Sequence, residues 1–234
     1  MNGTRRGRIE HRRSGLSRRD FLRLSRSVAI GAVVGGALPG LIWLDNAVAA
    51  IPASDGYILV DTKKCQGCMS CMLACSLVHE GQENLSLARI QVVEDPFERF
   101  PDDITVEQCR QCVEPACLEV CPTGALHVDS EHGNVRRVDV GECIGCMSCV
   151  GACPYSPSRA IWNFRDEHAQ KCDLCVATPH WKEEGGPNGK QACVEVCPVG
   201  AISYTGEIPV QAGDEGYKVN LRGSGWGKLG YPTD

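Results

Sequence analysis

The sequence predicts an α+β fold of short strands, short helices and long loops, and three observations support it. Two sequence blocks each occur twice, short β-like runs lie between them, and Phe, Tyr and Trp make up only 6% of the residues. Few aromatic residues leave little large apolar surface to bury, so the apolar core should be thin. We therefore expect something other than a large apolar core to hold the chain together.

The repeated blocks indicate a duplicated unit. "CQGCMSCMLAC" at 65–75 resembles "CIGCMSCVGAC" at 143–153, and "CLEVCPTGALHV" at 117–128 resembles "CVEVCPVGAISY" at 193–204. Because the two kinds of block alternate along the chain, a duplication of about eighty residues is the simplest account.

The regular elements between the blocks are expected to be short. β-like runs occur at 57–61 ("YILVD"), 88–93 ("ARIQVV"), 125–129 ("ALHVD") and 135–140 ("VRRVDV"). The turn "SEHGN" should join the last two runs as a hairpin. The helical signal is limited to single turns around the cysteines, such as "CMLACSLVHE".

Charge divides the chain into two parts. Residues 1–49 contain nine Arg and no Lys against three acidic residues, a net charge of +6, and the remainder has 15 Lys and Arg against 26 Asp and Glu, a net charge of −11. An acidic remainder argues against nucleic-acid binding, because few basic groups would be left over to neutralise phosphates.

Residues 1–49 are typical of an export signal. "SRRDFL" at 17–22 matches the twin-arginine pattern, with Arg18 and Arg19 as the pair. A weakly apolar stretch at 27–44 follows, and "AVA" at 47–49 suits cleavage before Ala50. We expect a periplasmic protein exported by the twin-arginine route. Retention as an uncleaved membrane anchor is the alternative, since eighteen residues just suffice to span a bilayer.

The spacing of the sixteen cysteines is the most informative feature of the chain. They fall into four groups of four that leave no thiol unassigned. The groups are Cys65, Cys68, Cys71 and Cys75; Cys109, Cys112, Cys117 and Cys121; Cys143, Cys146, Cys149 and Cys153; and Cys172, Cys175, Cys193 and Cys197. Pro follows the last cysteine of every group except the first, where Ser76 follows Cys75.

Three kinds of chemistry compete for these thiols. Disulfides are the default for an exported, cysteine-rich chain, but bridges within a C-x2-C-x2-C run would close almost no loop and so would stabilise little. Zinc usually takes two separated C-x2-C pairs and has no use for a third cysteine three residues on. A 4Fe–4S cluster does require the third cysteine, because three closely spaced thiolates bind three irons of one cube. The fourth cysteine binds the neighbouring cube. The spacing therefore predicts four 4Fe–4S clusters.

The four ordered groups resemble the iron–sulfur subunits of the dimethyl-sulfoxide-reductase family, over roughly residues 57–204. The sequence is also similar to polyferredoxin partners of molybdenum or tungsten enzymes. The resemblance implies two nested modules of bacterial-ferredoxin type. The inner module would span 109–154, the outer module 50–108 together with 155–204, and a Gly-rich extension would follow at 205–234.

The resemblance also implies which cysteines share a cluster. The four implied ligand sets are Cys65, Cys68, Cys71 and Cys197; Cys75, Cys172, Cys175 and Cys193; Cys109, Cys112, Cys117 and Cys153; and Cys121, Cys143, Cys146 and Cys149. The sequence supports this nesting, because "YILVD" before the first group and "AISY" after the last remain as natural strand partners.

No nucleophile–base motif, phosphate loop or open metal site is evident, so the expected role is electron transfer without catalysis. The leading hypothesis is a subunit that relays electrons between a molybdenum or tungsten catalytic subunit and a quinone-linked membrane subunit or a soluble partner. A free soluble polyferredoxin and a structural zinc or disulfide scaffold are the alternatives. Basic residues beside cysteines (Lys64, Arg110 and Lys171) are expected either to raise a cluster's potential or, as the favoured interpretation, to be solvated charges without effect.

The Gly-rich segment 205–234 has no periodicity. It is interpreted either as a flexible tail or as an arm that lies on a partner, with Trp226, Leu229 and Tyr231 as anchors.

Overall fold

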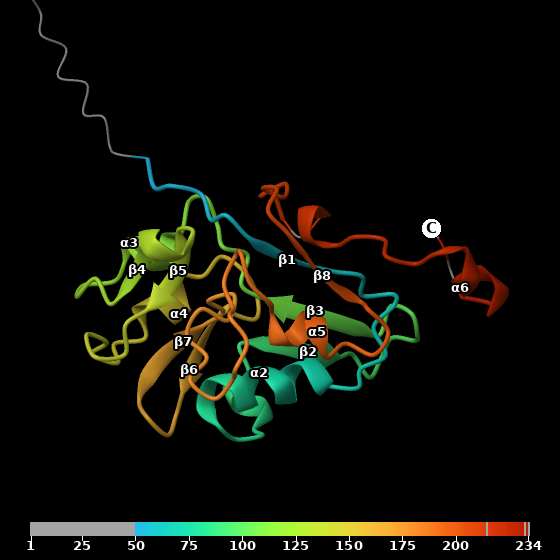
Figure 1. The fold of residues 1–234 in the computed structure, drawn as a ribbon, viewed down its shortest axis with the longest axis horizontal. Helices are drawn as coiled ribbons and strands as arrows, with labels where there is room; N and C mark the ends of the chain where they lie inside the picture. Colours follow the sequence, from blue (N-terminus) through green and yellow to red (C-terminus); the bar gives the residue numbers. More distant parts are fainter. Residues whose placement is uncertain (1–49, 214, 232, 234) are drawn as a thin grey trace, which may run out of the picture. The chain divides into compact units, whose positions relative to one another are not determined.

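Four small antiparallel sheets, each of two strands, make up the regular β-structure of the part described (Figure 1). The computed structural model describes residues 50–213, 215–231 and 233, so the predicted signal segment 1–49 lies outside the described residues. The strand pairs are β1 (Tyr57–Val60) with β8 (Ile202–Thr205), β2 (Ile90–Glu94) with β3 (Ile104–Gln108), β4 (Leu126–Asp129) with β5 (Val135–Val138), and β6 (Ala160–Asn163) with β7 (His168–Lys171).

Two predicted pairings are confirmed. β1 pairs with β8, with Ile58 opposite Tyr204 and Val60 opposite Ile202, so strands nearly 150 residues apart close on each other. β4 and β5 form the predicted hairpin, and the 3-10 turn η2 (Ser130–His132) lies between them.

Three strands, β3, β6 and β7, were not predicted. β7 has the sequence "HAQK", and all four of its residues are buried. A strand with three polar residues lacks the apolar pattern by which buried strands are recognised. Its burial depends on packing against other parts of the fold rather than on its own composition.

Helices are short except for one. They are α2 (Ser70–Glu80), α3 (Ala116–Glu119), α4 (Ser148–Ala152), α5 (Ala192–Glu195) and α6 (Ser224–Lys228), with the 3-10 turns η1 (Leu85–Leu87) and η3 (Glu215–Tyr217). The prediction of single turns was wrong for α2, which has eleven residues. α4 ends before Pro154, because proline cannot occupy the next helical position. Ser76 is compatible with a helix, so α2 continues to Glu80 and ends at Gly81, which has a left-handed conformation.

The cysteines form part of the core. One buried cluster combines strand residues such as Ile58, Val60 and Ile90 with Cys71, Cys75 and Cys193. A second combines Leu126, Ala160 and Ala169 with Cys117 and Cys149. The apolar side chains thus pack around the thiols, as the low aromatic content suggests.

Part of the C-terminal segment packs on its own chain. Lys218 forms a parallel bridge with Val60, and the buried Tyr217 contacts the ring of Tyr57 edge to face and donates a hydrogen bond to the carbonyl oxygen of Arg110 at 2.6 Å. Figure 1 shows the red C-terminal chain following β1 before it reaches α6. Beyond this contact, Leu229 is exposed.

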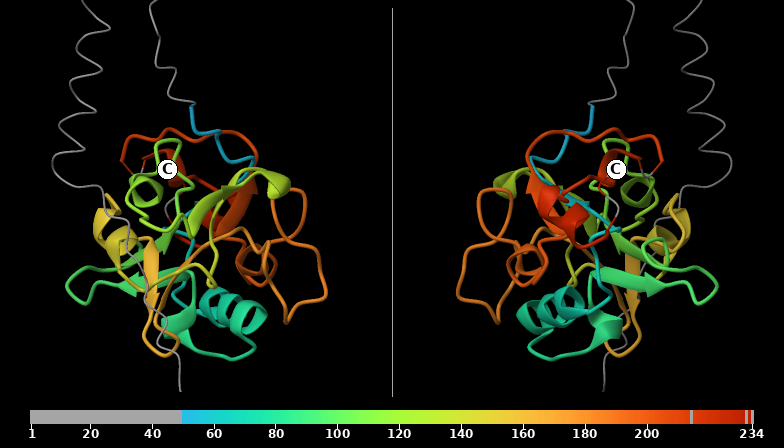
Figure 2. Two further views of the ribbon diagram at one scale, coloured as in Figure 1. Left: turned by 90° about the vertical axis from the view of Figure 1, so that its left-hand side faces the viewer. Right: turned by 90° about the vertical axis from the view of Figure 1, so that its right-hand side faces the viewer.

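The seventeen-residue gap within the last cysteine group forms the expected loop. Residues 176–190 contain no helix or strand, and Figure 2 shows this orange segment extending at the side of the unit. None of the helices among the described residues has the length and apolar character needed to cross a membrane.

Candidate cluster-binding sites

The sixteen cysteines gather in four sets, which combine groups that are distant in sequence. In the first set, burial and the neighbouring thiolates of Cys65, Cys197 and Cys68 raise the pKa of the Cys71 thiol to about 12. Cys197 therefore lies beside three cysteines that precede it by more than a hundred residues. The pairing of β1 with β8 accounts for this proximity, because these strands lie just before Cys65 and just after Cys197.

The second set contains Cys75, Cys172, Cys175 and Cys193. Burial, followed by the charges of Cys175, Cys172 and Cys75, raises the pKa of Cys193 well above its usual value. Cys75 belongs to this set because α2 places it away from Cys65, Cys68 and Cys71.

The third set contains Cys109, Cys112, Cys117 and Cys153. Burial raises the pKa of Cys117, the charge of Lys171 lowers it, and the thiolates of Cys109 and Cys153 raise it again. Cys112 interacts in the same way with Cys109 and Cys117.

The fourth set contains Cys121, Cys143, Cys146 and Cys149. Burial raises the pKa of Cys149, and the charges of Cys117, Cys143 and Cys121 add to this rise. Cys146 is exposed, and its charge interacts with that of Cys121.

The donor sets fit a group that contains several metal atoms. All sixteen cysteines are free thiols, and within the described ranges no three His, Cys, Asp or Glu side chains converge tightly enough to hold a single metal ion. The four thiols of the second set line one cavity and those of the fourth set line another, an arrangement that suits a cluster in which each thiolate binds a different iron. Because burial favours the protonated thiols, binding of iron would have to displace their protons.

Backbone amides donate hydrogen bonds to the last cysteine of each sequence group. The amide of Arg89 lies 3.3 Å from Cys75 Sγ, that of Leu126 3.3 Å from Cys121 Sγ, that of Arg159 3.2 Å from Cys153 Sγ and that of Ala201 3.2 Å from Cys197 Sγ. Each donor lies at or just before the start of β2, β4, β6 or β8. The four strands therefore position N–H groups on sulfur, which is one way in which a protein tunes a cluster.

The glycines of the repeated "C-x-G-C" motifs stand in tight turns. Gly67 has φ +65° and Gly145 has φ +71°, and a Cβ on Gly145 would lie 2.8 Å from the carbonyl oxygen of Glu167. Both the turn and the close approach require glycine at position 145.

The four sets follow one another in space. Charges interact between Cys71 of the first set and Cys193 of the second, between Cys172 of the second and Cys109 of the third, and between Cys149 of the fourth and Cys117 of the third. Cys68 in the first set and Cys146 in the fourth are exposed. The first and the fourth set therefore each have a thiol at the surface.

The favoured interpretation of the basic residues as solvated charges was wrong for two of the three. Lys171 is only 5% exposed and Arg110 only 2% exposed. Lys64 is partly buried and donates hydrogen bonds to the carbonyl oxygens of Gly200 and Leu221. Sequence reasoning missed the buried Arg136 and Arg159 and the partly buried Arg89, because none of the three is adjacent to a cysteine.

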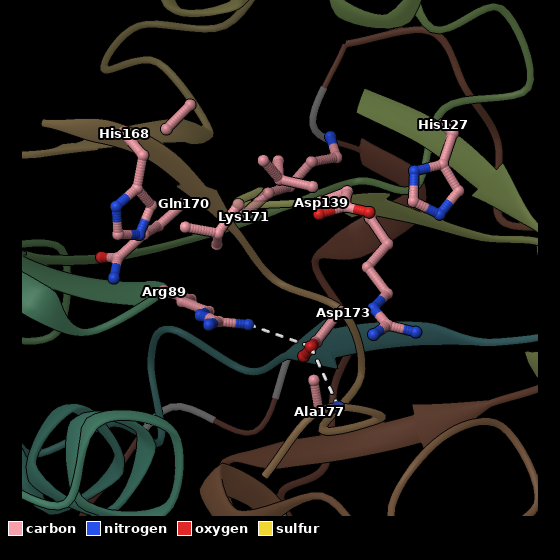
Figure 3. A pocket seen from close by; sticks show the side chains of 12 residues that line it. Arg89, His127, Asp139, His168, Gln170, Lys171, Asp173 and Ala177 are labelled. Carbon is pink, nitrogen blue, oxygen red and sulfur yellow. Dashed lines mark hydrogen bonds and ion pairs between the residues drawn. The ribbon is translucent and has the colours of Figure 1, made fainter. Parts of the chain in front are cut away.

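Arg89 lies beside the second set as part of an ion-pair network. Its guanidinium contacts Asp173 at 2.9 Å and Glu80 at 3.4 Å. Arg89, Asp173 and Lys171 all line a cavity of about 290 Å³. Figure 3 shows Arg89 directed at Asp173 beside this cavity. Two carboxylates thus pair with the guanidinium of Arg89 at this set.

Comparison with known proteins identifies iron–sulfur domains in this chain. Residues 102–207 match the family described as "4Fe-4S dicluster domain", and residues 62–78 match "4Fe-4S binding domain". The chain is 35% identical over 153 residues to the putative electron transport protein YsaA of Escherichia coli K12, which covers 62% of this chain and 87% of that protein.

Two further relatives have similar coverage. The NrfC homolog of Haemophilus influenzae is 33% identical, over 80% of this chain and 79% of that protein. The thiosulfate reductase electron transfer subunit PhsB of Salmonella typhi is 36% identical, over 63% of this chain and 74% of that protein. With its four-cysteine sets and these relatives, the chain belongs to the family of ferredoxin-type 4Fe–4S electron-transfer proteins.

Proposed function

We propose that this chain is a non-catalytic electron-transfer subunit that binds four 4Fe–4S clusters. It relays single electrons between a catalytic subunit with a molybdenum or tungsten cofactor and a second redox partner, either a quinone-linked membrane subunit or a soluble protein. The observation that carries the proposal is the gathering of sixteen free cysteines in four sets of four.

The residues of the chain have three tasks in this role. The sixteen thiolates hold the clusters, each of which, when bound, takes up and gives back one electron. Strand amides donate hydrogen bonds to Cys75, Cys121, Cys153 and Cys197 and so stabilise negative charge on sulfur. Buried side chains keep water from the second and third sets. Cys68 of the first set and Cys146 of the fourth are exposed and lie where partners would approach.

The proposal includes the nested organisation and the export of the chain. Residues 109–154 form an inner module and residues 50–108 with 155–204 an outer one, a division supported by the pairing of β1 with β8. Residues 1–49 direct the protein to the periplasm by the twin-arginine route, an assignment supported by "SRRDFL" and the cleavage-like "AVA".

Iron and acid-labile sulfide analysis of the anaerobically purified chain tests the cofactor content. We expect roughly sixteen iron and sixteen sulfide per chain, as four cubes require. Near-zero iron, or zinc in its place, would show that the sets are structural sites and would contradict the proposal.

A free polyferredoxin is the second candidate, and purification from the native cell under mild conditions distinguishes it. A dedicated subunit should elute with a molybdenum- or tungsten-containing protein at constant ratio. A chain that elutes alone in every fraction would favour the free carrier. PhsB, whose name describes an electron-transfer subunit of thiosulfate reductase, supports the dedicated role.

A further inference from the structure

Among the buried cations around the third set of cysteines, Lys171 and Arg136 both interact with Cys109, Cys112 and Cys117. Lys171, on β7, donates from Nζ to Cys117 Sγ at 3.6 Å, and its charge interacts with Cys109, Cys112 and Cys117. Arg136, on β5, has no exposed surface, and its charge interacts with the same three cysteines. β5 and β7 contact each other, so both cations face one set from neighbouring strands.

Neither cation has a carboxylate partner among the residues that the structure describes. Arg136 instead donates to the carbonyl oxygens of Cys112 at 3.1 Å and Asn134 at 2.5 Å, and its buried Nη2 has no hydrogen-bond partner. The second set differs, because its neighbour Arg89 pairs with both Asp173 and Glu80.

Unpaired buried charges are costly, because they lose the solvation that water provides. Two such cations at one cysteine set are tolerable only if an opposite charge lies near them. The four thiolates of the third set, together with a bound cluster, would provide this negative charge. The interior thus places two buried cations without a carboxylate partner among the described residues at the third set.

We propose that Lys171 and Arg136 selectively raise the reduction potential of the cluster held by Cys109, Cys112, Cys117 and Cys153. This inference rests on the proposed function, since it requires that the set binds a cluster. Reduction adds one electron, here from the donor partner or a chemical titrant, and it forms or breaks no bond. A fixed positive charge nearby stabilises the added negative charge and so favours the reduced form.

The test is a redox titration of the fully loaded chain, followed by electron paramagnetic resonance. Lys171→Met removes the charge and keeps an unbranched side chain. We expect the one-electron reduction equilibrium constant of one cluster to fall about tenfold, or ~59 mV, with the other three unchanged. Lys171→Arg restores the charge and should return that potential close to its original value.

Arg136→Met provides an independent variant and Arg137→Met its matched control. Arg137 is the next residue on β5, but its side chain is partly exposed and pairs with Asp129 at 2.5 Å. Arg136→Met should lower the potential of the same cluster as Lys171→Met, whereas Arg137→Met should leave all four potentials unchanged.

Iron and sulfide counts on the same samples separate the two proposals. A wild-type chain without clusters contradicts the proposed function itself. Fully loaded Lys171→Met and Arg136→Met chains with four unchanged potentials overturn this inference alone, as does a shift of different clusters by the two variants. If the Lys171→Met chain binds only three clusters, the redox titration of the fully loaded Arg136→Met chain tests the inference instead.

Discussion

At the scale of single residues, Asp61 links the C-terminal segment to the entrance of the first cysteine group. Its carboxylate is 2% exposed and accepts hydrogen bonds from the amide of Lys64 at 3.2 Å and the amide of Leu221 at 2.8 Å. It also pairs with the guanidinium of Arg222 at 3.0 Å. One side chain thus connects β1, the approach to Cys65 and a segment 160 residues further on.

Asp61→Ala should therefore destabilise the loaded protein. Removal of the carboxylate leaves buried donors unsatisfied, and we expect a loss of about 3 kcal/mol in unfolding free energy. Thermal unfolding measures the loss, and limited proteolysis should show earlier cleavage after residue 205. Glu98→Ala removes an exposed carboxylate and is the control. Equal unfolding temperatures of the two variants would contradict the assigned role of Asp61.

Individual residues also show how far sequence reasoning extends. Cysteine spacing indicates the ligands because clusters demand closely spaced thiolates, and that demand is local. The burial of Lys171 and Arg136 is not local, because it depends on the contact between β5 and β7. The sequence alone does not distinguish a buried basic residue beside a cysteine from a solvated one.

At the scale of elements, α2 illustrates how one residue changes the exit from a cluster site. Ser76 follows Cys75 in the middle of the helix, and its hydroxyl donates to the carbonyl oxygen of Leu73 and accepts from the amide of Asn84, both at 3.0 Å. In the repeated motif, Pro154 follows Cys153 and α4 stops at Ala152. The absence of a proline after Cys75 was visible in the sequence, but the length of the helix was not anticipated from it.

Ser76→Pro should disrupt the second half of α2. Proline removes a backbone donor and clashes with the preceding turn, at a cost of about 3 kcal/mol or more. We expect lower helical circular dichroism, a lower unfolding temperature and loss of iron from the second set, which contains Cys75.

Ser76→Ala is the matched control for this change, because it removes the same hydroxyl and keeps the backbone amide. It should cost about 1 to 3 kcal/mol and leave the iron content intact. If both variants retain the same helix content and stability, the helix does not depend on the residue after Cys75.

Strands were predictable where their composition carries the signal. β1, β4, β5 and β8 contain β-branched or aromatic residues in short runs, and their pairings were expected. β7 was missed because its residues are buried although three of the four are polar, so tertiary context overrides the apolar pattern. The four strand-start amides on sulfur were likewise invisible, since they depend on the turn geometry that follows each cysteine group.

At the scale of the whole molecule, the thiols and the apolar side chains form joint cores. Cys71, Cys75 and Cys193 belong to one buried cluster of residues, and Cys117 and Cys149 belong to another. In a chain whose core contains its ligand sets, the free energy of cluster binding is also free energy of folding. Under the proposed function, the chain acquires its clusters, and folds, before it leaves the cytoplasm.

Under the same proposal, the arginine pair of "SRRDFL" has a specific role. Replacement of Arg18 and Arg19 together by Lys should keep the protein in the cytoplasm in a folded, iron-loaded form, since only the proposed export signal is changed. Cell fractionation followed by iron analysis measures both location and loading. The control replaces Arg12 and Arg13 together by Lys, which alters an equal number of arginines outside "SRRDFL" and should not affect export. Continued export of the Arg18 and Arg19 variant would show that transport of the loaded protein does not depend on "SRRDFL".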